Sequence, residues 1–192
     1  MKEIFKLAGI LMLVTAVASS ALSIVNNLTK DEIEKQKRKA VKASLAVALP
    51  ISARNAIHPI KKGDKILYYK GYAPEDTTRL NGYAFLAIGK GYSSKIKTMV
   101  GVDTTGKICG IKIISQKETP GLGTKIEKID FQEQFKNKIA EDLKVVPKQT
   151  AEREGGIGSI TGATISSKAV TKSIRIAIDT TLALIRAEKD NL

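Results

Sequence analysis

The sequence predicts an α+β protein, in which an N-terminal transmembrane helix and a stalk helix precede a small, mostly antiparallel sheet packed with helices. Three stretches carry this prediction: an uncharged apolar run over 7–25, short strand-like segments over 66–114, and a helical pattern over 166–187. We therefore expect three parts, which are an anchor over 1–28, a stalk over 29–50 and a folded domain over 51–192.

The composition suits one folded domain with an appendage. The 192 residues are 43% hydrophobic and 27% charged, and their formal net charge is +13. Such a charge suits nucleic acid or an anionic membrane, but aromatic residues make up only 5% and no lysine cluster is combined with a stacking platform. We therefore expect no nucleic-acid partner. Cys109 and His58 are each the single residue of their type, so we expect no internal disulfide and no metal site.

The apolar run from Leu7 to Val25 has the length of a membrane span. About 19 residues at a rise of about 1.5 Å extend for about 30 Å, the thickness of a bilayer core. Ser19-Ser20-Ala21 could be the cleavage site of a secretory signal, but the run continues beyond it. We favour a retained anchor. No cysteine directly follows the run, which excludes a lipoprotein anchor.

The charges beside this run give conflicting signals about orientation. Lys2 and Lys6 favour a cytoplasmic N-terminus, whereas more basic residues follow the run, namely Lys30, Lys35, Lys37, Arg38, Lys39 and Lys42. Both an anchor and a signal at this position export the chain that follows. We therefore expect a single-pass protein of the cell (inner) membrane with an extracytoplasmic domain.

Residues 29–49 have the pattern of a separate helix. Thr29 and Glu32 form a capping-box sequence, which predicts a helix start at Thr29. Apolar residues then recur at helical spacing until Pro50, which cannot continue a helix. We expect a charged stalk helix that packs its apolar edge on the folded domain.

Four segments between Ile66 and Ile114 are rich in β-branched or aromatic residues and are separated by Gly, Asn or Asp. They predict strands over 66–69, 83–88, 96–102 and 108–114. Asp103-Thr104-Thr105-Gly106 is a turn sequence, which makes the last two strands an antiparallel hairpin. His58 lies before them in a segment that we interpret as a loop or turn. No Walker or Rossmann glycine motif is present.

The stretch Lys117-Glu118-Thr119-Pro120-Gly121-Leu122-Gly123-Thr124 combines a tight turn with two glycines that allow close approach of the backbone. After it, Asp130 and Glu133 suggest the cap of a short helix that ends at Ile139. Residues 143–146 are a candidate last strand. Residues 147–160 have the polar, glycine-rich composition of a loop.

Small residues and hydroxyls gather at the predicted start of the last helix, in Gly158-Ser159-Ile160-Thr161-Gly162-Ala163-Thr164-Ile165-Ser166-Ser167. A helix start of this kind can hold a phosphate. It can equally be a plain cap, with Ser166 or Ser167 as the N-cap. A hydrolase that uses Thr164 as nucleophile is poorly supported, because no neighbouring residue could act as its base.

The two motifs Glu-Thr-Pro-Gly-Leu-Gly and, some forty residues later, Thr-Gly-Ala-Thr-Ile-Ser-Ser together resemble the FMN-binding domain family. Within it, the chain is similar to the G subunits of Rnf ion-translocating electron-transport complexes, which are related to the C subunit of the sodium-pumping quinone reductase. The anchor, stalk, strands and last helix follow the family's order. The resemblance therefore covers essentially the whole chain, and its predicted domain is an FMN-binding domain.

The resemblance implies a covalent cofactor. In the family, the FMN phosphate is esterified by a flavin transferase to the last threonine of the motif, which is Thr164 here. By the same resemblance, one set of residues lies along the flavin (Glu118, Thr119, Leu122 and Gly123) and another lies around the phosphate (Thr161, Gly162, Ala163 and Ser166). Members often carry Asp where this chain has Gly158, and that Asp is associated with recognition by the transferase.

The function implied by the resemblance is electron relay, one electron at a time, within a complex that couples ferredoxin oxidation and NAD reduction to Na⁺ or H⁺ translocation. We expect no catalytic residue and little independent turnover, with other subunits of the complex, the transferase and membrane lipid as partners. Two alternatives stay open. One is a cofactor-free, membrane-anchored interaction domain whose basic surface binds partner subunits or acidic lipids. The other is a related flavoprotein that serves a different redox chain.

Overall fold

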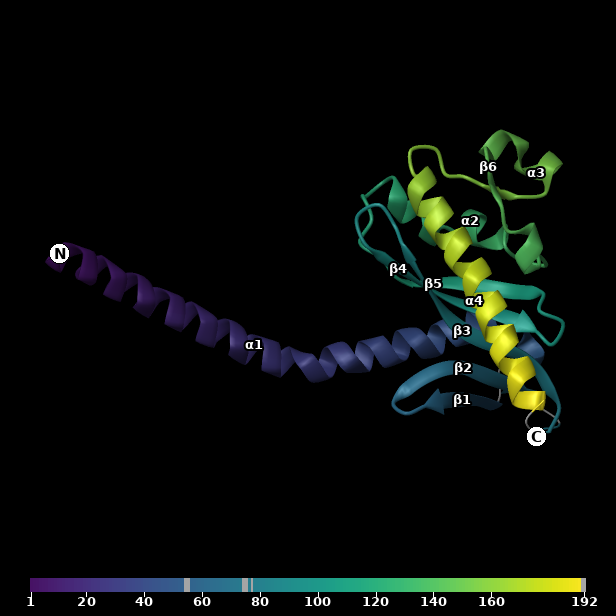
Figure 1. Cartoon of the computed structure of the whole chain (residues 1–192), viewed down its shortest axis with the longest axis horizontal. Helices are drawn as coiled ribbons and strands as arrows, with labels where there is room; N and C mark the ends of the chain where they lie inside the picture. Colours follow the sequence, from purple (N-terminus) through teal and green to yellow (C-terminus); the bar gives the residue numbers. More distant parts are fainter. Residues whose placement is uncertain (54–55, 74–75, 77, 191–192) are drawn as a thin grey trace. The chain divides into compact units, whose positions relative to one another are not determined.

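The fold is described from a computed structural model of the whole chain (Figure 1). The structure describes residues 1–53, 56–73, 76 and 78–190. Two compact units are present, Met1–Ala40 and Val41–Leu192, and each is described by itself.

The first unit is part of one long helix, α1 (Lys2–Ala48). Its apolar N-terminal stretch is long enough to cross a membrane, and its residues are exposed. The predicted helix start at Thr29 is wrong, because α1 runs through this position and the Thr29 hydroxyl donates a 2.8 Å hydrogen bond to the Val25 carbonyl oxygen. No glycine or proline separates the two predicted helices, so continuous backbone hydrogen bonding overrides the local start signal.

The second unit is built on an antiparallel sheet with the strand order β1-β2-β3-β4-β5. Its strands are β1 (Ala56–Lys62), β2 (Lys65–Tyr72), β3 (Leu80–Lys90), β4 (Lys95–Asp103) and β5 (Ile108–Ser115). The α+β prediction and its four strands are confirmed. The loop predicted around His58 is wrong, because His58 lies within β1 and pairs with Lys70 of β2.

Helix α4 (Thr164–Asp190) covers one face of this sheet and forms the main core with it (Figure 1). Its buried side chains recur at three and four residues, as at Val170, Ile174 and Ile178, which are almost fully enclosed. They pack with sheet residues such as Phe85 and Val100. The helical pattern of the sequence therefore predicted the buried face of α4 correctly.

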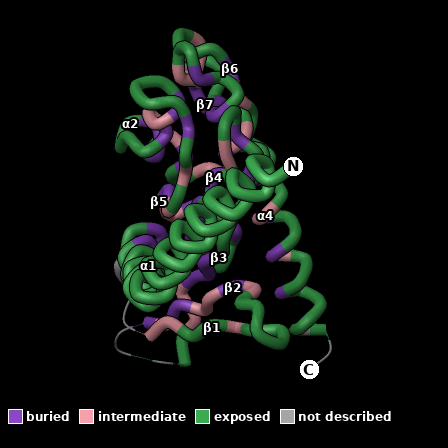
Figure 2. Tube along the Cα trace, turned by 90° about the vertical axis from the view of Figure 1, so that its left-hand side faces the viewer, coloured by how far each residue is buried: buried purple, intermediate pink, exposed green. Residues whose placement is uncertain are grey.

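The last turns of α1 pack on the opposite face of the sheet. Leu45, Ala48 and Leu49 form a second buried cluster there with Ala84 and Met99. This close approach explains why residue 101 of β4 is a glycine, since a Cβ atom at that position would lie 2.2 Å from the Ala48 carbonyl oxygen. Figure 2 shows the resulting contrast between buried positions in the sheet and the exposed length of α1.

Short elements connect β5 to α4. They are η2 (Gly123–Glu127), α2 (Ile129–Glu133), η3 (Ala140–Asp142), β6 (Val145–Val146), η4 (Lys148–Thr150), α3 (Ala151–Glu154) and β7 (Ile157–Gly158). The expected helix to Ile139 is shorter than predicted, because α2 ends at Glu133 and Asn137 adopts a left-handed conformation with φ 64°. The candidate strand near Leu143 is present as β6, which pairs in parallel with β7.

Candidate functional site

The candidate site lies at the first turn of α4. The helix begins at Thr164, and its first backbone bond runs from the Ser167 N–H to the Ala163 carbonyl oxygen over 3.0 Å. Neither Ser166 nor Ser167 is the N-cap, so that expectation is wrong. The N–H groups of Thr164 and Ile165 point out of the helix start, where the helix dipole favours a negative charge.

The turn before Thr164 is held by the hydroxyl of Ser167. This hydroxyl accepts a bond of 3.1 Å from the Ile160 N–H and donates one of 3.0 Å to the Ala163 carbonyl oxygen. Gly162 has φ 78°, a conformation that side-chain-bearing residues rarely adopt. The motif therefore forms a tight turn that leaves the Thr164 side chain exposed and buries Ala163.

Glu118 joins this turn to the sheet. The residue is only 5% exposed, and its Oε2 accepts a 2.6 Å hydrogen bond from the Ser166 hydroxyl. The other donors come from the β3–β4 turn: the Tyr92 N–H at 2.9 Å, the Ser93 N–H at 3.1 Å, the Ser94 N–H at 2.9 Å and the Ser94 hydroxyl at 3.1 Å. Glu118 therefore positions two loops rather than offering a free group to a ligand.

The hydrogen bonds of Glu118 decide its charge. Burial by itself would raise the pKa of this carboxyl, but the bonds from the Ser166 hydroxyl and from the backbone of the β3–β4 turn outweigh it. The pKa of Glu118 is therefore lowered, and the group is a carboxylate at neutral pH.

The loop over residues 119–124 packs directly against the start of α4. The Leu122 and Thr124 N–H groups both bond the Thr119 carbonyl oxygen, at 3.2 and 3.3 Å. Gly123 is buried, and a Cβ atom there would lie 2.6 Å from Glu118 Cβ and 3.0 Å from the Ser166 hydroxyl oxygen. Only glycine fits at this point without displacement of the loop.

The structure brings most of the expected site residues together. Glu118 bonds Ser166, Gly123 lies against both, and a Cβ atom on Gly162 would be 3.0 Å from Leu122 Cδ2. Leu122 is 43% exposed and Ile165 54% exposed, so two apolar side chains lie open beside the helix start. Thr119 and Thr161 are also exposed.

Sequence reasoning missed the β3–β4 turn, Gly91-Tyr92-Ser93-Ser94, as part of this site. A Cβ atom on Gly91 would lie 2.6 Å from a carboxylate oxygen of Glu118, and Tyr92 is 70% exposed. The available signal was an aromatic residue in a glycine- and serine-rich turn between two strands, where no core position is expected.

Thr161 also lines a hollow of about 470 Å³ beside the turn. Its lining includes three lysines, Lys125, Lys128 and Lys148, together with Gly158 and Ser159. The Gly158 N–H donates a 2.6 Å bond to the side-chain oxygen of Gln134. Gly158 is closely packed, because a Cβ atom there would lie 3.1 Å from both Ala151 Cβ and the side-chain oxygen of Gln134.

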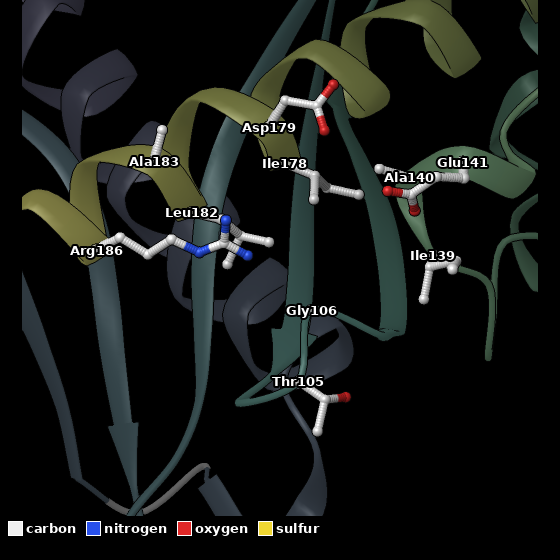
Figure 3. Close-up of a pocket in the computed structure, with 10 residues that line it drawn as sticks. All are labelled: Thr105, Gly106, Ile139, Ala140, Glu141, Ile178, Asp179, Leu182, Ala183 and Arg186. Carbon is white, nitrogen blue, oxygen red and sulfur yellow. The ribbon is translucent and has the colours of Figure 1, made fainter.

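A second hollow, of about 490 Å³, lies near the other end of α4 (Figure 3). Ile178, Leu182 and Arg186 line it, with Thr105 and Gly106 of the β4–β5 turn. Ile178 follows Thr164 by fourteen residues, or about 21 Å along the helix at about 1.5 Å per residue. This hollow is therefore separate from the Thr164 site. Among the described residues, no cluster of His, Cys, Asp or Glu could hold a metal ion.

Comparison with known families defines the class of the protein. Residues 91–179 match the FMN-binding domain family, and residues 1–47 match the RnfG N-terminal region. The candidate site lies within the first of these matches. Residues 91–179, which hold the candidate site, therefore match an FMN-binding domain, as the two motifs predicted.

Whole-chain relatives narrow the class. The chain is 34% identical to the G subunit of the Na(+)-translocating ferredoxin:NAD(+) oxidoreductase complex of Acetobacterium woodii, over 92% of this chain and 91% of that protein. It is 30% identical to the G subunit of the ion-translocating oxidoreductase complex of Vibrio vulnificus, over 89% and 86%. The crystal structure of Shewanella oneidensis NqrC aligns with a TM-score of 0.49 and 18% identity, over 71% and 72%. The chain belongs to the family of G subunits of ion-translocating oxidoreductase complexes.

Proposed function

We propose that this chain is the membrane-anchored electron-relay subunit of an ion-translocating ferredoxin:NAD⁺ oxidoreductase complex, and that its FMN is esterified through phosphate to Thr164. The observation that carries the proposal is the position of Thr164. Its side chain is exposed at the first residue of a helix that is otherwise packed on the sheet, within the part of the chain that matches FMN-binding domains.

The residues at the helix start suit a phosphodiester. Gly162 and Ala163 add little bulk beside Thr164, and the unpaired N–H groups of the first turn supply donors to phosphate oxygens. Glu118 is the carboxylate that is hydrogen-bonded to the first turn of α4. Five donors already satisfy it, and it faces the interior. The donor set therefore favours an anionic group over a cation.

The surroundings also suit a flat, largely apolar ring system. Leu122 and Ile165 offer exposed apolar surface at the helix start, and a Cβ atom on Gly162 would lie 3.0 Å from Leu122 Cδ2. FMN, when bound, supplies the redox chemistry, while the protein binds and orients it. The exposed position of Leu122 would leave one edge of such a group open to a partner.

Thr164 suits an attachment point better than a nucleophile. Activation of a threonine hydroxyl needs an adjacent base. His58, the single histidine, lies in β1 and packs edge-on against Tyr72, with ring centroids 5.5 Å apart. Glu118 holds a lowered pKa and bonds Ser166 rather than Thr164.

The remaining parts of the proposal concern the membrane and the partners. Residues 1–28 would anchor the chain, residues 29–50 would connect the anchor to the domain, and the domain over 51–192 would lie outside the cytoplasm. The anchor carries no charged residue between Leu7 and Val25, so ion translocation, of Na⁺ or H⁺, belongs to other subunits. A flavin transferase would attach the FMN, and a covalent bond would prevent its loss outside the cytoplasm.

The test is in-gel fluorescence after denaturing electrophoresis of protein made together with a flavin transferase. We expect a fluorescent band for the wild type that disappears in Thr164→Ala. Thr180→Ala is the matched control, because it removes another exposed threonine hydroxyl of α4, outside the motif, and should retain the band. A colourless wild-type band, or a band retained in Thr164→Ala, would refute attachment at Thr164.

Orientation needs a separate measurement. Gly155 lies in an exposed turn with φ 69° and has open space around it. A protease site introduced at this turn should be cleaved in intact cells, or in spheroplasts where an outer membrane is present. Protection of the site until the inner membrane is opened would refute an extracytoplasmic domain.

A further inference from the structure

The β3–β4 hairpin carries a pair of like charges beside the Thr164 site. Lys90 and Lys95 occupy directly paired positions at the ends of the two strands, and both are exposed. Like charges directly opposite each other destabilise a sheet. Within the described parts of the chain the single ion pair is Lys35 with Glu32, so neither lysine is neutralised by a salt bridge.

The same hairpin presents an aromatic side chain. Tyr92 lies between the two lysines and is 70% exposed, while its backbone N–H is held by Glu118 at 2.9 Å. The backbone of the tip is therefore fixed and the ring is free to contact a partner. Tyrosine on a rigid backbone is a frequent anchor of protein interfaces, because it contributes contact area at little cost in entropy.

This hairpin is adjacent to the Thr164 site. Glu118 Oε2 accepts bonds from both the Tyr92 N–H and the Ser166 hydroxyl, so the tip and the first turn of α4 share one carboxylate oxygen. Two more exposed lysines lie near the hairpin. The Lys117 backbone N–H donates a bond of 2.8 Å to the Ser94 hydroxyl of the tip. Lys168 precedes Ala169, whose carbonyl oxygen would lie 2.4 Å from a Cβ atom on Gly89 of β3.

From this arrangement we propose that Lys90, Tyr92 and Lys95, with Lys117 and Lys168 beside them, form a docking surface for an acidic protein surface. We call these five residues the hairpin face. The proposal rests on the proposed function in one respect, which is that the partner exchanges electrons with FMN at Thr164. An anionic lipid headgroup neither donates nor accepts electrons, so a basic face beside the flavin favours a protein partner. Opposite charges would increase the rate of encounter and orient the complex.

The chain contains a matched control. Lys62 and Lys65 are also exposed and directly paired, at the tip of the β1–β2 hairpin. Figure 1 shows that hairpin well apart from the start of α4. Reversing two charges at either tip changes the net charge of the protein equally, so a difference between the two variants reports position rather than total charge.

The experiment measures binding of a fluorescein-labelled oligoglutamate peptide to the full chain in detergent, by anisotropy at increasing salt. In Lys90→Glu/Lys95→Glu we expect affinity to fall by about tenfold or more and the salt dependence to weaken, while Lys62→Glu/Lys65→Glu should change it much less. Equal losses in both variants would overturn the proposal. So would an unchanged affinity for the peptide together with lost binding to phosphatidylglycerol vesicles, which would identify a membrane-binding face.

Two further variants separate the possible failures. Lys90→Glu alone places opposite charges across the hairpin. This variant should unfold at the same or a higher temperature than the wild type and yet bind the peptide less tightly. If binding is lost only together with stability, the proposal is refuted. Thr164→Ala should bind the peptide as the wild type does. A wild-type protein that lacks the fluorescent band but binds the peptide through Lys90 and Lys95 would refute the proposed flavin attachment alone. A fluorescent wild-type protein whose peptide binding does not depend on these lysines would refute the docking surface alone.

Discussion

The Ser166 hydroxyl donates a buried hydrogen bond of 2.6 Å to Glu118 Oε2, across 48 residues of sequence. Glu118 also accepts bonds from the β3–β4 turn, so one carboxylate connects that turn, the glycine-rich loop and the first turn of α4. The position of Thr164 relative to Leu122 and Tyr92 therefore depends on a single buried charge.

Glu118→Gln should destabilise the domain in a pH-dependent way. An amide presents one acceptor where the carboxylate has two, so one group of donors loses its partner, at a cost of about 1–3 kcal/mol. Folding lowers the pKa of Glu118 below its ordinary value of 4.5. Its charge therefore stabilises the wild type fully at pH values above about 4.5, and this contribution is lost as the pH falls below that value. Thermal unfolding of the full chain in detergent should show this acid-side loss in the wild type.

The glutamine variant should unfold with a weaker dependence on pH below neutrality. Ser166→Ala is a useful companion, because it removes one donor and leaves the carboxylate bonded to the β3–β4 turn. The double variant should show a coupling free energy of about 0.5–3 kcal/mol between the two positions. Strict additivity of the two single variants would contradict the direct bond.

Gly123→Ala should destabilise the site by overpacking. The added methyl would lie 2.6 Å from Glu118 Cβ, so the loop must shift, at a cost of about 1–3 kcal/mol. The fluorescence of the FMN that we propose at Thr164 should change as well, since the shift alters the loop beside Thr164. Gly121→Asn is the control, because Gly121 has φ 73° with open space around it and asparagine tolerates this conformation. A similar melting temperature for Gly123→Ala and the wild type would refute the close contact.

Tyr68→Phe should reduce stability and change its response to alkaline pH. Tyr68 is fully buried and donates a hydrogen bond to Glu188 near the end of α4. Burial, and then the bond to Glu188, raise the pKa of Tyr68 above its ordinary value of 10.0. The neutral phenol therefore stabilises the fold below about pH 10, and this contribution is lost as the pH rises further.

The phenylalanine variant should lose about 1 kcal/mol at neutral pH and should show a smaller decline on the alkaline side. Some decline should remain, because burial also raises the pKa of Tyr69 and Tyr83. Tyr92→Phe, at the exposed hairpin tip, is the control for loss of a hydroxyl. An alkaline decline of the same size in Tyr68→Phe and the wild type would contradict this assignment.

Gly158→Asp should fit poorly in this chain. A Cβ atom there would lie 3.1 Å from both Ala151 Cβ and the side-chain oxygen of Gln134, and the added carboxylate would approach that oxygen. We expect a loss of about 1–3 kcal/mol, measured by thermal unfolding. Gly155→Asn, at an open position with φ 69°, should be nearly neutral by comparison. A Gly158→Asp protein as stable as the wild type would show that Gln134 can move aside.

Whether an element could be predicted depends on the range of the interactions that form it. The four strands from β2 to β5 were predictable because β-branched and aromatic side chains recur in short runs between turn residues. β1 was missed because Pro59 and the lysines at its end have low strand propensity. Proline and lysine are nevertheless well tolerated at a sheet edge, where β1 lies. The helix start predicted at Thr29 failed because a cap signal is worth little inside a continuous run of helix-forming residues.

By itself, the sequence determined the apolar span, the amphipathic face of α4, and the small residues and hydroxyls that open this helix, because each depends on neighbours within a few turns of the chain. Only the tertiary structure decided how Thr164 is surrounded. The antiparallel pairing of β3 with β4 brings Tyr92 to Glu118, and the packing of α4 on the sheet brings Ser166 to the same carboxylate. A buried carboxylate must be satisfied wherever it lies, and donors that are distant in sequence satisfy Glu118 here.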